Sequence, residues 1–84
     1  MDRITAPWTA QQVSALNLYQ RKGRFHPFTC GGERGDAAHR AYAASHGDRD
    51  EGLLVAHPDG WRCPVCGYRQ DWAHAIMADP GSAF

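Results

Sequence analysis

The sequence has no long hydrophobic run and no excess of charge of either sign. Its apolar stretches stay well short of the roughly 18 residues that a membrane-spanning helix needs, so we expect no membrane segment. Nine Lys and Arg residues balance nine Asp and Glu residues, which gives a formal net charge of zero. Because domains that bind nucleic acid through its phosphates usually have an isoelectric point above about 9, general polyanion binding is disfavoured.

Cysteine is also scarce, with only three residues in the chain. An odd number cannot pair completely, which disfavours a closed disulfide framework. The N-terminus shows no secretory signal pattern, so we expect a cytoplasmic, reducing environment in which thiols stay free. Closely spaced free thiols in such an environment are typical of a metal site or of thiol redox chemistry.

The most specific motif that is present is Cys63-Pro64-Val65-Cys66-Gly67. Two thiolates separated by two residues can both reach one tetrahedral Zn²⁺, with Zn–S bonds of about 2.3 Å. Proline stiffens the turn, and glycine accepts the positive φ that points backbone amides at the sulfurs. A redox Cys-x-x-Cys motif would need a thioredoxin-like βαβ context, which this chain does not show. The motif therefore predicts half of a structural zinc site.

The other half of the site must lie elsewhere, because structural zinc takes four ligands. Cys30 supplies the third, and one of five histidines should supply the fourth. His39 is the leading candidate, since the glycine-rich loop between it and Cys30 can bend the chain back to the metal. His46 is the alternative, and would close a longer loop. The weaker candidates are His26, His57 and His74. The predicted ligands of one Zn²⁺ per chain are Cys30, His39, Cys63 and Cys66.

The size of the chain makes such a metal useful to the fold. A domain of 84 residues buries only a little over ~60% of its unfolded surface, so its core is marginal without a staple. Metal binding energy becomes folding energy in such a domain. We therefore predict a single small α+β zinc-bound domain over residues 1–84. It should have an N-terminal helix, a zinc-ribbon-like antiparallel hairpin of two to three strands, and a short C-terminal helix.

Local signals place two helices in the first half of the chain. Thr9 and Gln12 form a capping box for a helix over residues 10–21. A second, short helix is expected over residues 37–45, because Asp36 can cap its start and the alanines favour it. On that helix the two candidate histidines would share one face, which leaves the choice between them open.

The zinc module is expected over residues 25–72. Residues 53–56 and 61–63 have the character of antiparallel strands joined by a Pro-Asp-Gly turn, and this hairpin would deliver the second cysteine to the metal. A third strand is expected at about residues 68–70. After it, Asp71 would cap the final helix over residues 72–78, and the tail at 80–84 would follow.

Two blocks of sequence are distinctive when they occur together. One is His26-Pro27-Phe28-Thr29-Cys30, and the other is the pattern GWxCPxCxYxQxWA that begins at Gly60. With them the chain resembles a group of small zinc-ribbon-like proteins encoded by actinobacteria and especially by their phages. The resemblance covers about residues 8–75. It implies that the histidine after the first cysteine, here His39, is a ligand, and it implies no known activity. The chain departs from the group in a longer alanine-rich stretch after His39, which keeps His46 open.

Together these features predict a structural zinc-binding interaction module that docks on a host or phage protein in the bacterial cytoplasm. The alternative is a nucleic-acid-binding zinc ribbon that uses a set of basic residues: Arg21, Lys22, Arg24, Arg62 and Arg69. We do not expect an enzyme, because a catalytic zinc keeps an open coordination position and needs a general base. The His-x-Glu that accompanies Pro-Cys-x-x-Cys in zinc deaminases is also missing from this sequence. Iron in the same four-ligand site stays open.

Overall fold

The computed structural model describes residues 2–22, 27–32 and 35–79, and these form two α-helices and two small antiparallel sheets. The elements are β1 (Arg3–Thr5), α1 (Ala10–Lys22), α2 (Ala37–His46), β2 (Val55–His57), β3 (Gly60–Arg62), β4 (Arg69–Gln70), β5 (Trp72–His74) and the 3₁₀ helix η1 (Ala75–Ala78). This confirms the predicted α+β class. None of the described helices is long and apolar enough to cross a membrane. Arg24, His26 and the predicted tail lie outside the described residues.

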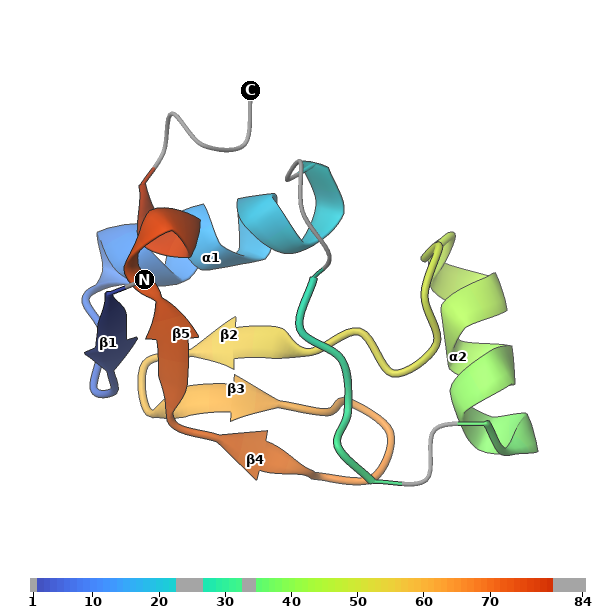
Figure 1. The fold of residues 1–84 in the computed structure, drawn as a ribbon. Helices are drawn as coiled ribbons and strands as arrows, with labels where there is room; N and C mark the ends of the chain where they lie inside the picture. The colour runs from blue at the N-terminus through green and yellow to red at the C-terminus, as the bar shows by residue number, and fades with distance from the viewer. Residues whose placement is uncertain (1, 23–26, 33–34, 80–84) are drawn as a thin grey trace.

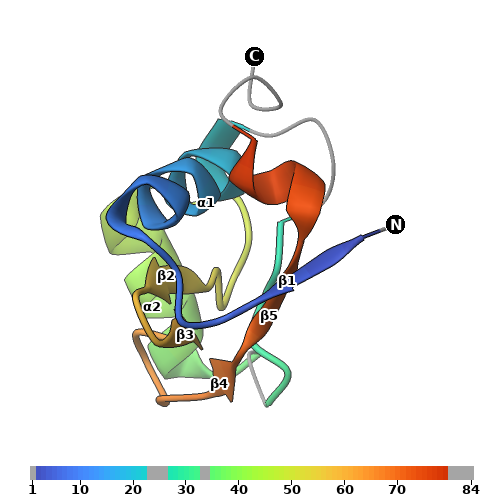
Figure 2. The ribbon, with the colours of Figure 1, turned by 90° about the vertical axis from the view of Figure 1, so that its left-hand side faces the viewer.

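Strands β2, β3 and β4 form a sheet in that order, and helix α1 lies across it (Figure 1). The view turned by 90° also places α1 above β2 and β3 (Figure 2). Helix α2 stands at one end of this sheet, and the β1–β5 pair lies at the other end. In Figure 1 the segment at residues 27–32 runs down the page on the α2 side of the sheet, crossing the direction of β3, and the β3 arrow points toward α2. The predicted ligand segments therefore meet at the α2 end.

Helix α1 begins where the capping box predicts. The Thr9 amide donates to Gln12 Oε1 at 2.9 Å, and the Gln12 amide donates to Thr9 Oγ1 at 3.1 Å. These two bonds satisfy amides that have no partner within the helix. Trp8, just before the cap, is buried. The helix extends to Lys22, one residue beyond the predicted end.

Two amide side chains of α1 fasten the helix to backbone groups beside the sheet. The Asn17 side chain makes two hydrogen bonds to the backbone of Ala56. It accepts from the Ala56 amide at 2.7 Å and donates to the Ala56 carbonyl at 3.2 Å. Gln20, which is buried, donates to the carbonyls of Phe28 at 2.7 Å and Leu54 at 2.9 Å. It also accepts from the Phe28 amide at 2.9 Å. Gln20 therefore holds the segment that precedes Cys30 against both the helix and the sheet.

The Cys30 segment continues the sheet beyond β2. The Leu54 amide donates to the Phe28 carbonyl at 3.1 Å, and the Cys30 amide donates to the Gly52 carbonyl at 2.7 Å. An isolated antiparallel bridge joins Thr29 to Leu53. The segment is extended, as the sequence predicts, and these bonds fix the backbone position from which the Cys30 side chain projects.

The predicted hairpin is present, with β2 and β3 antiparallel and His57 opposite Gly60. Its first strand begins at Val55, two residues later than expected, because the preceding leucines pair with the Cys30 segment instead. The predicted third strand is β4, which pairs with β3 through Trp61 and Gln70. The chain between β3 and β4 is the Cys-Pro-x-Cys-Gly knuckle.

The expected helix over residues 72–78 is wrong in its first half. Trp72–His74 form β5, and only Ala75–Ala78 turn as a 3₁₀ helix. The reason is a pairing partner that local signals do not reveal, because β1 lies antiparallel to β5 with Ile4 opposite Ala73. The Ala6 amide also donates to the Asp71 carbonyl at 2.8 Å. The N-terminal segment therefore supplies a strand that no local signal indicates.

The core is centred on Trp61, whose side chain is fully buried. Its ring meets Trp8 and Phe28 edge-on at centroid distances of 5.6 and 5.7 Å, and its Nε1 donates to the Trp72 carbonyl at 3.0 Å. Two of the predicted metal ligands, the side chains of Cys30 and Cys63, belong to the same buried cluster. The candidate site is therefore continuous with the hydrophobic core.

Candidate metal centre

The four predicted ligands come together from three separate segments of the chain. Cys30 ends the segment beside β2, His39 lies in the first turn of α2, and Cys63 and Cys66 flank the knuckle after β3. Their ligand atoms all lie within 4.8 Å of one another. These four side chains therefore could hold one metal ion between them.

Two separations within the cluster are close to the edges of a metal-ligand tetrahedron. The sulfurs of Cys30 and Cys66 are 3.5 Å apart, and the sulfur of Cys63 is 3.4 Å from His39 Nε2. Around a tetrahedral Zn²⁺ with ordinary bond lengths, two sulfurs lie roughly 3.8 Å apart and a sulfur and a nitrogen roughly 3.6 Å. A disulfide would need about 2.05 Å, and all three cysteines are free. The donor set and its size both fit a zinc ion.

His39 is held in place by Asp36. The Asp36 carboxylate caps α2 by accepting from the His39 amide at 2.9 Å, and the same oxygen is 2.7 Å from His39 Nδ1. With Nδ1–H donating to this carboxylate, the lone pair on Nε2 points to the sulfur cluster. The hydrogen bond raises the pKa of His39 to about 9 in the metal-free site, and the His39 amide lowers the pKa of Asp36. A metal bound at Nε2 would displace the proton that Nε2 carries when the imidazole is protonated.

Each half of the site has a backbone amide directed at a sulfur from two residues farther along the chain. The Gly32 amide donates to Cys30 Sγ at 3.3 Å. The Tyr68 amide is bonded to Cys66, and it is the main reason that the pKa of Cys66 falls to about 7. Burial instead raises the pKa of Cys30 to about 11, against the opposing effect of Gly32. Such amides stabilise the thiolate form, which is the form that binds metals.

The knuckle turn is closed at both ends by backbone hydrogen bonds. The Gly67 amide donates to the Cys63 carbonyl at 3.0 Å, and the Cys63 amide donates to the Tyr68 carbonyl at 2.7 Å. Gly67 has a φ of 76°, so the positive φ predicted for this glycine is confirmed. The turn therefore holds its two cysteine side chains on the same side.

The two half-sites also pack directly on each other through Gly31 and Tyr68. A Cβ placed on Gly31 would lie 2.7 Å from the Tyr68 ring, well inside contact distance. The ring therefore fills the space that a side chain would need. This packing joins the Cys30 loop to the knuckle.

The other described histidines lie away from the cluster. His46 is exposed at the end of α2, where its ring stacks on Tyr42 at 3.8 Å and its Nδ1 lies 2.9 Å from the Tyr42 carbonyl. His74 packs against Phe28 with ring centroids 5.6 Å apart. His57 is half-buried in β2. The structure therefore favours His39 over His46, the alternative that the sequence leaves open.

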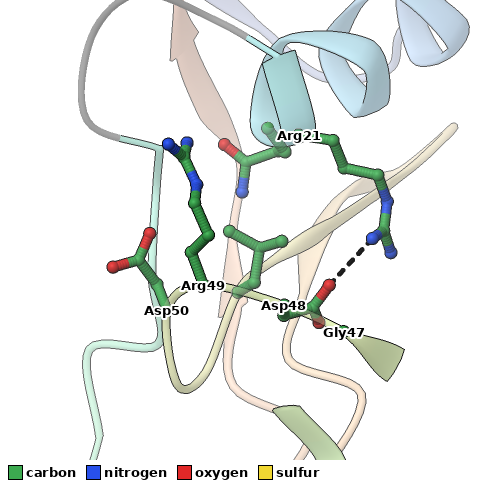
Figure 3. Close-up of a pocket in the computed structure, with 7 residues that line it drawn as sticks. Arg21, Gly47, Asp48, Arg49 and Asp50 are labelled. Atoms are coloured by element: carbon green, nitrogen blue, oxygen red, sulfur yellow. Dashed lines mark hydrogen bonds and ion pairs between the residues drawn. The ribbon is translucent and has the colours of Figure 1, made fainter. Parts of the chain in front are cut away.

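The basic residues of the nucleic-acid alternative are largely paired with carboxylates. Arg21 meets Asp48 at 2.8 Å (Figure 3). Arg62 meets Asp59 at 2.5 Å, and Arg69 pairs with the same carboxylate. The two arginines, Arg62 above all, lower the pKa of Asp59. Of the remaining two, Lys22 is exposed and Arg24 lies outside the described residues. Nucleic-acid binding stays a prediction.

The hollow drawn in Figure 3 lies between the end of α1 and the loop after α2, and its volume is about 110 Å³. Its lining mixes both signs of charge: Gln20, Arg21, Gly47, Asp48, Arg49, Asp50 and Leu53. Within the described residues, none of the clustered metal-ligand side chains lines it.

Sequence reasoning assigned Asp36 only the capping role and gave Gln20 no role. The Asp-x-x-His spacing at Asp36 and His39 is the signal for the first, because a helix N-cap lies next to the side chain three residues on. No local signal marks Gln20, whose partners lie in two distant segments.

Comparisons with protein-family models, curated proteins and solved structures found no match. The geometry of this site is therefore the main indication of what the protein does.

Proposed function

We propose that this protein is a structural zinc-binding module in which one Zn²⁺ is held by Cys30, His39, Cys63 and Cys66. The observation that carries the proposal is the meeting of these four donors, from three segments of chain, within 4.8 Å. Three thiolates and one imidazole form a common donor set of structural zinc sites. Soft sulfur ligands in tetrahedral arrangement also bind iron, so the identity of the metal is part of the test.

A structural rather than a catalytic role follows from the number of protein ligands. Catalytic zinc keeps one coordination position for water or substrate, whereas four protein side chains fill a tetrahedron. Three of the four side chains, those of Cys30, His39 and Cys63, are also buried. When bound, the metal would neutralise thiolate charge and join α2, the Cys30 segment and the knuckle. The carboxylate of Asp36 would orient His39 and hold its Nδ1 proton.

Cobalt substitution tests the coordination directly. We expect the Co²⁺-loaded protein to show the intense visible bands of tetrahedral coordination, together with the near-ultraviolet charge-transfer bands of thiolate ligands. His39→Ala should weaken and shift these bands because it opens the fourth position. His46→Ala is the matched control and should leave them unchanged. Bands of six-coordinate Co²⁺ in the wild type, or the same response in both variants, would contradict the proposed site.

We further propose that the metal-supported fold serves as a docking module for a protein partner. Its small size and balanced charge support this role. The resemblance to phage-encoded proteins adds a host or phage protein of the bacterial cytoplasm as the partner. Cross-linking in cells tests this, with the wild type compared with His39→Ala. A partner cross-linked only to the wild type would support docking by the folded module, and identical cross-links from both proteins would contradict it.

A further inference from the structure

Cys66 differs from the other members of the cluster in its exposure. Cys30, His39 and Cys63 are buried, with exposed fractions of 4%, 1% and 2%. Cys66 is the one exposed member of the cluster. A small oxidant in solution can therefore reach Cys66, whereas Cys30 and Cys63 are buried. The oxidation of thiols depends on their exposure and thiolate character, so Cys66 is the thiol that the oxidant attacks first.

The sulfur of Cys30 lies in direct contact with the sulfur of Cys66, at 3.5 Å. Closing this pair to a disulfide requires a movement of roughly 1.5 Å, which side-chain rotation and small backbone shifts can supply. The sulfur of Cys63 instead faces His39 Nε2, at 3.4 Å. Cys30 is therefore the better placed of the two to react with an oxidised Cys66.

We propose that Cys66 is a site of oxidation by peroxides and that Cys30 resolves the oxidised sulfur into a Cys30–Cys66 disulfide. In the first step the Cys66 thiolate attacks one oxygen of hydrogen peroxide, and the O–O bond breaks. The products are a sulfenic acid on Cys66 and hydroxide, which takes up a proton from the buffer and becomes water. In the second step the Cys30 thiolate attacks Cys66 Sγ, the S–O bond breaks and hydroxide leaves. Two thiolates have lost two electrons, and hydrogen peroxide, with two protons, has become two water molecules.

The disulfide would change how α2 is held. It removes two of the four donors and leaves only His39 and Cys63, so the site can no longer hold a structural metal. Helix α2 stands at the end of the sheet (Figure 1). Its buried residues are only His39 and Ala43. The new bond would keep the Cys30 segment on the knuckle while α2 loses its metal anchor. The release of metal rests on the proposed function, but formation of the disulfide does not.

The test is treatment of the purified, reduced wild type with hydrogen peroxide under conditions that keep the protein folded. Metal content is measured beforehand, metal release is followed with a coloured chelator, and the disulfide is located by non-reducing proteolysis and mass spectrometry. We expect Cys30–Cys66 as the main cross-link, formed in step with loss of the metal. A main Cys63–Cys66 cross-link, or Cys66 oxidised without any cross-link, would overturn the proposal.

These readouts separate the two proposals. A metal-free starting protein that still forms Cys30–Cys66 would overturn the metal module and support the disulfide. A metal-loaded protein that forms no Cys30–Cys66 bond would overturn the disulfide and support the metal module. Cys66→His adds a control, because a Cys₂His₂ set still suits zinc. We expect peroxide to release metal from it at least about tenfold more slowly, since the exposed thiolate is gone. Release as fast as from the wild type would overturn Cys66 as the thiol that the oxidant attacks first, and the wild-type cross-link does not depend on this variant folding.

Discussion

At the scale of single residues, Asp36 combines two tasks in one oxygen atom. The same carboxylate oxygen accepts from the His39 amide and lies 2.7 Å from His39 Nδ1. The first contact starts α2, and the second orients the ligand imidazole. The two tasks respond differently to substitution, because asparagine caps helices as well as aspartate does but carries no charge.

We therefore expect Asp36→Asn to lower zinc affinity by about 10-fold or more with little loss of helix, through the weaker hydrogen bond to the imidazole. Asp36→Ala should lose both tasks, with a fall in zinc affinity toward about 100-fold. It should also lose about 1 kcal/mol of stability from the missing cap. Competition with a coloured chelator measures the affinity, and circular dichroism measures the helix. Unchanged zinc affinity in Asp36→Asn would contradict the orienting role.

The metal-free ligands hold protons that a metal must displace. Burial raises the pKa of Cys30 to about 11, and Asp36 raises the pKa of His39 to about 9. Both groups are protonated at neutral pH in the metal-free protein, so metal binding must release their protons. We therefore expect zinc affinity to rise with pH between 6 and 8, with release of roughly two protons or more per metal. Calorimetry in buffers of different ionisation enthalpy counts these protons, and a pH-independent affinity would contradict the ligand set.

At the scale of elements, the link between α1 and the Cys30 segment depends on Gln20. Its side chain makes three hydrogen bonds to backbone groups of Phe28 and Leu54. Removing a buried side chain of this kind leaves its partners without hydrogen bonds, which costs free energy for each group.

We expect Gln20→Ala to lower the free energy of unfolding by about 2 to 4 kcal/mol. The matched control is Gln11→Ala, an exposed glutamine of the same helix, which should change stability by less than about 0.5 kcal/mol. Urea denaturation at saturating zinc measures the free energy of unfolding of both variants. Equal effects of the two substitutions would show that the Gln20 bonds do not hold the segment.

The turn between β2 and β3 depends on Gly60. Its φ is 131°, and a Cβ there would lie 2.8 Å from the Gln70 carbonyl oxygen of the paired strand. We expect Gly60→Ala to destabilise the fold by about 1 to 3 kcal/mol, since both the strain and the clash must be relieved. Gly35→Ala is the control, because a Cβ there meets nothing within 4 Å. Thermal unfolding followed by circular dichroism distinguishes them, and a neutral Gly60→Ala would contradict this reading of the turn.

Elements with local signals could be predicted from the sequence, and elements formed by distant pairing could not. The capping box of α1, the Asp36 cap of α2 and the knuckle glycine all depend on residues within a few positions of each other. Strand β5 gave the opposite result, because its identity depends on β1 at the other end of the chain. The role of Gln20 could not be predicted for the same reason, because its partners lie in distant segments. Cys63 and Cys66 were accessible to sequence reasoning because their spacing is itself a local signal, whereas Cys30 and His39 followed from the need for four ligands.

At the scale of the whole molecule, the candidate site extends the core. Cys30 and Cys63 are buried in the same cluster as Trp61 and Leu16, and the metal would connect this cluster to α2. The metal would therefore stabilise the position of α2, whose buried residues are His39 and Ala43. In a chain of 84 residues such a staple contributes a large share of the folding free energy.

The measurement that tests this account most directly is the metal content per chain, by elemental analysis, of the wild type, His39→Ala and His46→Ala. We expect one zinc per chain in the wild type and in His46→Ala, and a marked loss in His39→Ala. Loss in His46→Ala alone would move the fourth ligand to the exposed end of α2. A well-folded wild type without metal would contradict the central claim that these four side chains form a structural metal site.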